Sequence, residues 1–194
     1  MKNFLVSVVF LLPFFAQAKT EEVALPENTT NVVKIYSQVL KYKIPSIFLN
    51  DAAVRQQDDS QFLLEMVPRG ETVERWTQMI TLTGFAGGIK KKLANNELLV
   101  NSIGSGFQKA CPNSFNYKLM SHSPKMSAVV FSCGDFSGHS ETTLIIGMDG
   151  REDVYSIQWA ERGKKSSTPL NIDQGKWQTR LQLLDPTLIS TVSP

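Results

Sequence analysis

The stretch FLLEMVPRGETVERWTQMITLTGF (Phe62–Phe85) contains two extended segments separated by a polar turn. The first segment, 62–67, is mainly apolar, and the turn follows at Pro68-Arg69-Gly70. The second segment, Arg75–Thr83, opens with Trp76 and is rich in β-branched residues, which favour strands. We therefore predict a hairpin with a charged end and an apolar body, around which the rest of the domain is organised.

The other strands are predicted from alternation or from short apolar runs. Val32–Leu40 is ambiguous between helix and strand, and Asp149-Gly150 is a strong turn signal between two later strands. The strands predicted outside the hairpin are Val39–Pro45, Ser127–Cys133, Thr142–Met148 and Val154–Ala160.

Two helices are predicted. Glycines at 84–88 break the hairpin strand, and apolar residues then recur at helical spacing from Ile89 to Phe107, with Leu93, Val100 and Ile103 between them. The segment Asp173–Leu184 forms a second amphipathic pattern that stops before a proline. Strands joined mostly as hairpins predict an α+β fold, a mostly antiparallel sheet covered by one long helix and a C-terminal helix.

The first 18 residues have the pattern of a secretory signal peptide. Lys2 supplies a positive charge, Phe4–Phe15 is apolar, and Ala16-Gln17-Ala18 is a small-x-small cleavage site. The apolar run is shorter than the roughly 20 residues that span a bilayer, and no later stretch is long and apolar enough to do so. We expect cleavage before Lys19 and export to the periplasm or the medium.

The remaining chain is predicted as a flexible lead-in, 19–31, followed by a single domain, 32–194. The sequence has 20 basic and 18 acidic residues, and removal of Lys2 leaves 19 against 18. A nearly neutral chain argues against nucleic acid or an anionic membrane as the partner, because binding to either depends mainly on basic charge.

The only cysteines are Cys111 and Cys133. In an oxidising compartment they are expected to form a disulfide, which would close a loop of about 20 residues and stabilise the fold by roughly 3 kcal/mol. A metal pair would need further ligands, and a catalytic thiol would leave its companion unexplained.

The block Glu65-x-Val67-Pro68-x-Gly70-Glu71, followed by Trp76-Thr77-x-Met79-Ile80-Thr81, resembles one in small exported bacterial proteins of uncharacterised function. Cys111-Pro112, Cys133-Gly134 and the closing segment Trp177–Leu184 are similar too. The order of strands and helices also resembles the PsbP-like α+β fold. The resemblance implies a binding scaffold, for instance a type II secreted host-interaction protein of the Legionella type, and brings no active-site residues with it.

Candidate site residues are few. Glu71 and Glu74 could form an acid/base pair, but ion pairing with Arg75 at the hairpin end is the commoner role for such residues. Glu71, Arg75 and Trp76 together suit recognition of a partner, because charged and aromatic side chains are frequent at interfaces. Trp76 could equally belong to the core.

His122 and His139 are the only histidines, and neither has the companions of a zinc site. The segment 133–139 places a serine close to His139 but lacks a G-x-S-x-G elbow, so a loop is the better interpretation. Glycines and lysines over 84–92 could bind an anion weakly at a helix start, or simply connect strand to helix. No metal or cofactor is predicted.

These patterns favour an exported, non-enzymatic binding protein that acts on a protein or envelope partner. Two other classes stay open. One is a small secreted hydrolase that draws on Glu71, His122 or His139, and the other is a structural accessory protein of the envelope.

Overall fold

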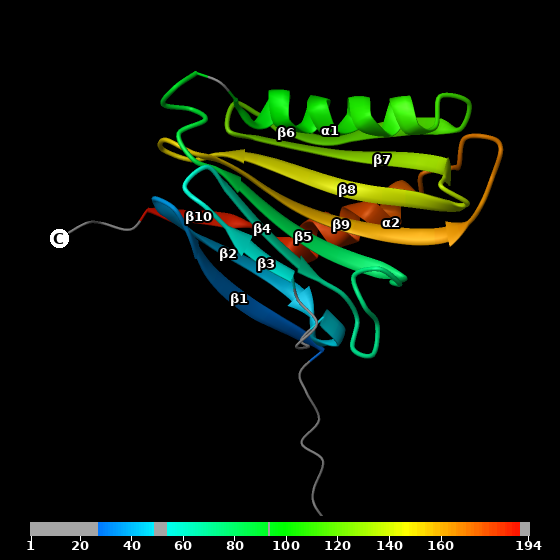
Figure 1. Cartoon of the computed structure of the whole chain (residues 1–194), viewed down its shortest axis with the longest axis horizontal. Helices are drawn as coiled ribbons and strands as arrows, with labels where there is room; N and C mark the ends of the chain where they lie inside the picture. The colour runs from blue at the N-terminus through cyan, green and yellow to red at the C-terminus, as the bar shows by residue number, and fades with distance from the viewer. Residues whose placement is uncertain (1–26, 49–53, 93, 191–194) are drawn as a thin grey trace, which may run out of the picture.

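The computed structural model describes residues 27–48, 54–92 and 94–190. In these residues two helices accompany two antiparallel sheets (Figure 1). The elements are β1 (Asn28–Ile35), β2 (Gln38–Pro45), η1 (Ser46–Phe48), β3 (Val54–Gln57), β4 (Gln61–Met66), β5 (Gln78–Phe85), α1 (Asn96–Ala110), β6 (Phe115–Ser123), β7 (Met126–Phe136), β8 (His139–Asp149), β9 (Val154–Lys164), α2 (Gln174–Leu184) and β10 (Thr187–Ser190).

The larger sheet has the strand order β3-β4-β5-β9-β8-β7-β6, and the smaller one the order β1-β2-β10. The predicted hairpin is confirmed, since β4 pairs with β5 and places Leu64 opposite Leu82. Its connection is a long loop over 67–77, and β5 begins at Gln78, later than the predicted start at Arg75. Trp76 therefore lies in this loop and not at the start of the strand.

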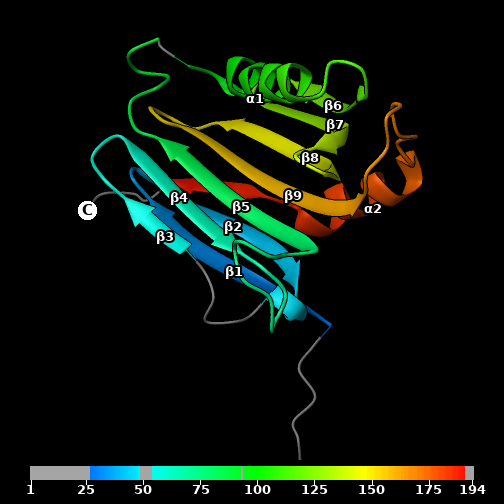
Figure 2. The ribbon, with the colours of Figure 1, turned by 45° about the vertical axis from the view of Figure 1, so that its right-hand side comes forward.

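Alternate residues of the larger sheet enter two different cores. Leu144 and Ile146 of β8 face the core shared with the smaller sheet and α2, whereas Ile145 between them packs under α1. Trp177 and Leu184 of α2 belong to the first core. Figure 2 shows α1 on one side of the larger sheet, with β2, β10 and α2 on the other. The α+β class predicted from the sequence is confirmed.

Helix α1 packs closely on β7. Val100 and Phe107 contact the side of the sheet that carries Val129 and Phe131. A Cβ atom added at Gly104 would lie 2.5 Å from the Phe131 ring, so the absence of a side chain at this position allows the close approach.

The predicted start of the first helix is wrong. Residues 86–92 form turns instead, with Gly87 and Lys92 at positive φ angles of 70° and 56°. The helix begins after Asn95, whose side chain accepts a hydrogen bond from the backbone N–H of Leu98 at 2.8 Å. Apolar spacing could not show this cap, and Leu93 lies outside the described residues.

The N-terminal strands also differ from the expectation. Asn28–Asn31, predicted as lead-in, belongs to β1, and Val32–Leu40 contains the hairpin between β1 and β2 with Tyr36 in its turn. Strands β3, β6 and β10 were not predicted. The proposed signal peptide and most of the lead-in lie outside the described residues. Within those residues, no helix is both long enough and apolar enough to cross a membrane.

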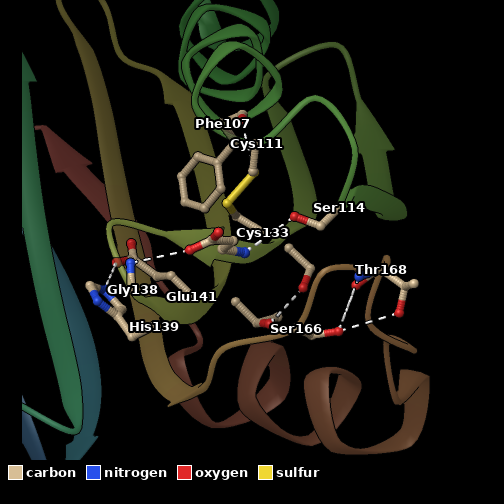
Figure 3. Close-up of a disulfide and its surroundings, with 12 residues drawn as sticks. Phe107, Cys111, Ser114, Cys133, Gly138, His139, Glu141, Ser166 and Thr168 are labelled. Atoms are coloured by element: carbon tan, nitrogen blue, oxygen red, sulfur yellow. Dashed lines mark hydrogen bonds and ion pairs between the residues drawn. A yellow bond between two sulfur atoms is a disulfide. The ribbon is translucent and has the colours of Figure 1, made fainter.

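The predicted pairing of Cys111 with Cys133 is confirmed, since their sulfur atoms lie 2.17 Å apart. Cys111 follows α1 and Cys133 lies in β7, and both are buried (Figure 3). The link joins the helix end to the second strand after it, because β6 lies between. Next to it, the backbone N–H of Ser166 donates to the Gly134 carbonyl at 2.7 Å.

Candidate functional site

The loop over 67–77 carries the three residues predicted to recognise a partner. Glu71 accepts hydrogen bonds from the backbone N–H and the hydroxyl of Thr77, each at 2.6 Å, so its carboxylate holds the loop closed. Arg75 is exposed. Trp76 is only 8% exposed, and the Arg162 guanidinium lies 3.8 Å from its ring centroid. The three residues therefore share a loop but do not present one exposed aromatic surface.

Beneath this loop is a cavity of about 350 Å³, here called the Trp76 pocket. It lies on the α1 side of the larger sheet, across β4, β5, β9 and β8, where polar side chains replace the apolar ones under α1. Glu65, Thr81 and Gln158 form one row across three strands. The second polar group in the pocket consists of Glu141, Thr143 and Arg162.

Glu141 is the most buried carboxylate of the pocket, with 14% of its side chain exposed. Burial raises its pKa, while the Arg162 guanidinium opposes that rise. Its Oε2 lies 3.7 Å from His139 Nε2 and 3.9 Å from Arg162 Nε, too far for hydrogen bonds. Burial also raises the pKa of Glu65.

The pocket does not suit a two-carboxylate hydrolase. Glu65 and Glu141 are three strands apart in the sheet and offset by four residues along it. Strand spacing of about 4.8 Å and a rise of about 3.3 Å per residue put their Cα atoms roughly 20 Å apart. Carboxylate pairs that hydrolyse glycosides lie about 5–9.5 Å apart, so these two do not form such a pair.

His139 lies at the start of β8, next to Glu141 (Figure 3). Burial and the nearby Arg162 charge lower its pKa, against the effect of Asp135. Ser137 and Gly138 form the turn between β7 and β8. The structure thus brings His139 towards the Trp76 pocket, whereas His122 lies on β6.

His122 takes part in an arrangement that looks like a catalytic triad but cannot work as one. His122 Nδ1 is 3.2 Å from Ser127 Oγ, and His122 Nε2 is 3.5 Å from Glu97 Oε1. Ser127, however, is only 4% exposed and donates its hydroxyl proton to Asn96 Oδ1 at 2.5 Å. A buried hydroxyl whose proton points away from the imidazole is not an activated nucleophile.

A second cavity, of about 400 Å³, runs between α1 and β6 and is here called the β6 groove. Phe115, Tyr117 and Leu119 alternate along β6 and line it together with Val129 and Phe131. Tyr117 and Leu119 are 63% and 58% exposed. The Phe115 ring stacks on Tyr117 and on Phe131, with centroids 6.1 Å and 6.2 Å apart. Exposed, ordered aromatic side chains of this kind are typical of interfaces.

Three lysines surround the β6 groove, while the nearest carboxylate of α1, Glu97, lies 3.5 Å from His122 of β6. No aspartate or glutamate occurs between Leu98 and Gly134, whereas Lys109, Lys118 and Lys125 do. Lys109 lies in the last turn of α1, Lys118 in the middle of β6, and Lys125 in the turn after it. The local field of the groove therefore favours an acidic partner although the whole chain is nearly neutral.

Sequence reasoning missed the β6 groove. The signal was the alternation Phe115, Tyr117, Leu119, which is short and interrupted by Met120. Comparison with known proteins adds no assignment: no protein-family model matches the chain, and no similar sequence was found among curated proteins. Among residues 27–48, 54–92 and 94–190, no group of three or more His, Cys, Asp or Glu side chains is placed to hold a metal ion. The functional proposals therefore rest on the geometry of the Trp76 pocket and the β6 groove.

Proposed function

We propose that this protein is an exported, non-enzymatic binding protein whose β6 groove receives an extended, acidic and apolar segment of a protein partner. The observation that carries the proposal is the position of the groove beside an open sheet edge. β6 pairs with β7 on one side and, among the described residues, with no strand on the other. An edge strand can accept a further strand from a partner. The backbone N–H of Tyr117 donates to the Asn116 side-chain oxygen at 2.9 Å, and an added strand would replace this local bond.

The side chains of β6 supply a reason for specificity. In an added strand, every second side chain would face the α1 side of the sheet, where Tyr117 and Leu119 expose apolar surface. Apolar residues at alternate positions of the partner would bury that surface. The lysines around the groove favour glutamate or aspartate at the positions between them.

Export supports the same role. The first 18 residues fit a signal peptide, and a disulfide between buried cysteines suits an oxidising compartment. The resemblance to exported bacterial proteins with a PsbP-like fold points in the same direction. No activated nucleophile accompanies His122 or His139 in the part of the chain that the structure describes, so binding is favoured over hydrolysis.

The test is a titration with synthetic eight-residue peptides in which apolar residues alternate with glutamate. Tyr117→Ala should raise the dissociation constant of the peptide roughly tenfold or more, because aromatic residues at the centre of an interface commonly dominate the binding energy. Lys118→Glu is expected to weaken binding of the glutamate peptide and to improve binding of a peptide with lysine at the same positions.

Matched controls are available on the smaller sheet. Val32 is 64% exposed and Lys34 is exposed, both on β1, so Val32→Ala and Lys34→Glu repeat the same kinds of change far along the chain from the groove. Both controls should bind the peptide like the unmodified protein. Equal weakening in the β6 and β1 variants, or binding of neither peptide by the unmodified protein, would overturn the proposal.

A further inference from the structure

The Trp76 pocket has unsatisfied polar groups concentrated around one carboxylate. In the described structure, four buried side-chain nitrogen or oxygen atoms lack a hydrogen bond of ordinary geometry, and three of them belong to His139, Thr143 and Arg162. These residues are the neighbours of Glu141 on β8 and β9. Buried polar atoms in native proteins are nearly always paired, so we expect an ordered water or a polar group of a ligand to complete this cluster.

A hydroxyl group satisfies this cluster best. Arg162 Nε–H is a donor, the ionised Glu141 carboxylate is an acceptor, and the Thr143 hydroxyl can act as either. One hydroxyl group can accept two hydrogen bonds and donate one. It can therefore accept from Arg162 and Thr143 and donate to the Glu141 carboxylate at the same time. An anion would be repelled by Glu141, and a cation would be repelled by Arg162.

The opposite end of the pocket requires a different group. Glu65 of β4 lines the pocket and is half-buried, and its side-chain carboxylate makes no hydrogen bond or ion pair with the described residues. A partly desolvated carboxylate without a partner favours a cation with N–H donors. With Glu65 and Glu141 against Arg162, the pocket has a formal charge of −1, which a single ammonium group would neutralise.

We infer that the Trp76 pocket binds a hydroxylated primary amine long enough to span it, such as an amino disaccharide, with its ammonium towards Glu65 and a hydroxyl among Glu141, Thr143 and Arg162. Thr81 and Gln158 lie between the two ends and offer further hydrogen bonds. A neutral sugar is a poorer fit, because it has no ammonium group to offer the Glu65 carboxylate at that end of the pocket. This site is separate from the β6 groove and does not depend on the function proposed for it.

The inference is tested by calorimetric titration of the oxidised protein with four probes. They are the β-1,4 dimer of glucosamine, its N-acetylated form, the corresponding glucose dimer, and the linear diamine 1,5-diaminopentane. The glucosamine dimer should bind most tightly. Removal of the ammonium, by acetylation or in the glucose dimer, should weaken binding about tenfold, as expected for loss of a charge-assisted hydrogen bond. The diamine should also be weaker, because it has no hydroxyl for the Glu141 cluster and is too short to reach that cluster from Glu65.

Substitutions separate the two ends of the pocket. Glu65→Gln should abolish the preference for the free amine over the acetylated form, while Thr143→Val should weaken both dimers by a similar factor. Glu97 is an exposed glutamate in α1, and Glu97→Gln is the matched control. It should change the affinity for neither the free nor the acetylated dimer. Thermal unfolding of each variant confirms that the fold is retained. Equal affinity for the free and acetylated dimers, binding of no probe, or a preference for free amine that survives Glu65→Gln would overturn the inference.

Discussion

Asn96 donates two hydrogen bonds to Asp149, from its backbone N–H to Oδ1 at 2.5 Å and from its side-chain amide to Oδ2 at 2.9 Å. Asn96 is the first residue of α1 and Asp149 the last of β8. The carbonyl oxygen of the same amide accepts from Ser127 of β7. One buried amide thus fixes the start of the helix that forms one wall of the β6 groove.

Asn96→Asp should therefore destabilise the protein strongly. A carboxylate would replace the donating amide and face Asp149, so we expect a loss of about 2–4 kcal/mol in the free energy of unfolding at neutral pH. Adding Asp149→Asn to the same chain exchanges donor and acceptor and should recover about 1–2 kcal/mol. Urea unfolding of the two single variants and the double variant measures this coupling. Additive losses would show that the two side chains do not interact.

Two glycines of α1 form a natural comparison. Gly104→Ala should cost about 1–3 kcal/mol, because the new Cβ meets the Phe131 ring at 2.5 Å. Gly106 has open space around it, so Gly106→Ala should stabilise the helix by about 0.5–1 kcal/mol. Thermal and urea unfolding distinguish the two. If Gly104→Ala stabilises the protein as Gly106→Ala does, then α1 does not lie close enough to β7 for a Cβ atom at position 104 to meet the Phe131 ring.

The disulfide should contribute substantially to stability. Replacing Cys111 and Cys133 together by alanine should lower the free energy of unfolding by about 2–4 kcal/mol, since the link closes a separation of 22 residues. Mass measurement with and without reduction, after alkylation under denaturing conditions, checks the bond in the purified protein. Two alkylated thiols in unreduced material would contradict both the link and the compartment argued from it.

Glu161 gives a prediction about pH. Burial raises the pKa of this carboxyl, but hydrogen bonds from Arg180 and Lys176 outweigh it, so its pKa lies below the ordinary value. A carboxylate with a lowered pKa stabilises the fold above its unfolded pKa, and that contribution is lost as the pH falls through the folded pKa. Glu161→Gln should cost about 1–3 kcal/mol at neutral pH and little in acid.

The exposed pair of Lys90 with Glu152 is the control for Glu161. Glu152→Gln should cost less than about 1 kcal/mol at any pH, because surface ion pairs contribute little. Unfolding measured across a pH series compares the two variants. Arg180 lies between the Trp159 and Trp177 rings. If Glu161→Gln lowers the free energy of unfolding by the same amount in acid as at neutral pH, the loss comes from packing around Arg180 and not from the charge of Glu161.

The parts of the fold visible in the sequence were those with local patterns. The hairpin of β4 and β5 and the strands β7, β8 and β9 have apolar or alternating runs that indicate strands directly. The second helix was predicted from its apolar spacing and observed as Gln174–Leu184. The start of α1 was mistaken because Asn96, which breaks the apolar stripe, is buried against Asp149, a residue 53 positions later.

The sites were harder to predict than the fold. Glu71, Arg75 and Trp76 were chosen because they are neighbours in sequence, but side-chain contacts separate them: Glu71 binds Thr77, and Trp76 lies under Arg162. Arg162 is 86 residues away from Trp76 along the chain, and only the pairing of β5 with β9 brings the two strands together. Such long-range register is not encoded in any local pattern.

The most direct test of the proposed function is hydrogen exchange of the β6 backbone amides in the oxidised protein, measured with and without the peptide in which apolar residues alternate with glutamate. Addition of a partner strand should slow exchange of the outward-facing amides between Phe115 and Leu119, while the amides of β1 keep their rates. Peptide binding that leaves the β6 amides unchanged, or that protects β1 equally, would contradict the assignment of this edge as the partner-binding surface.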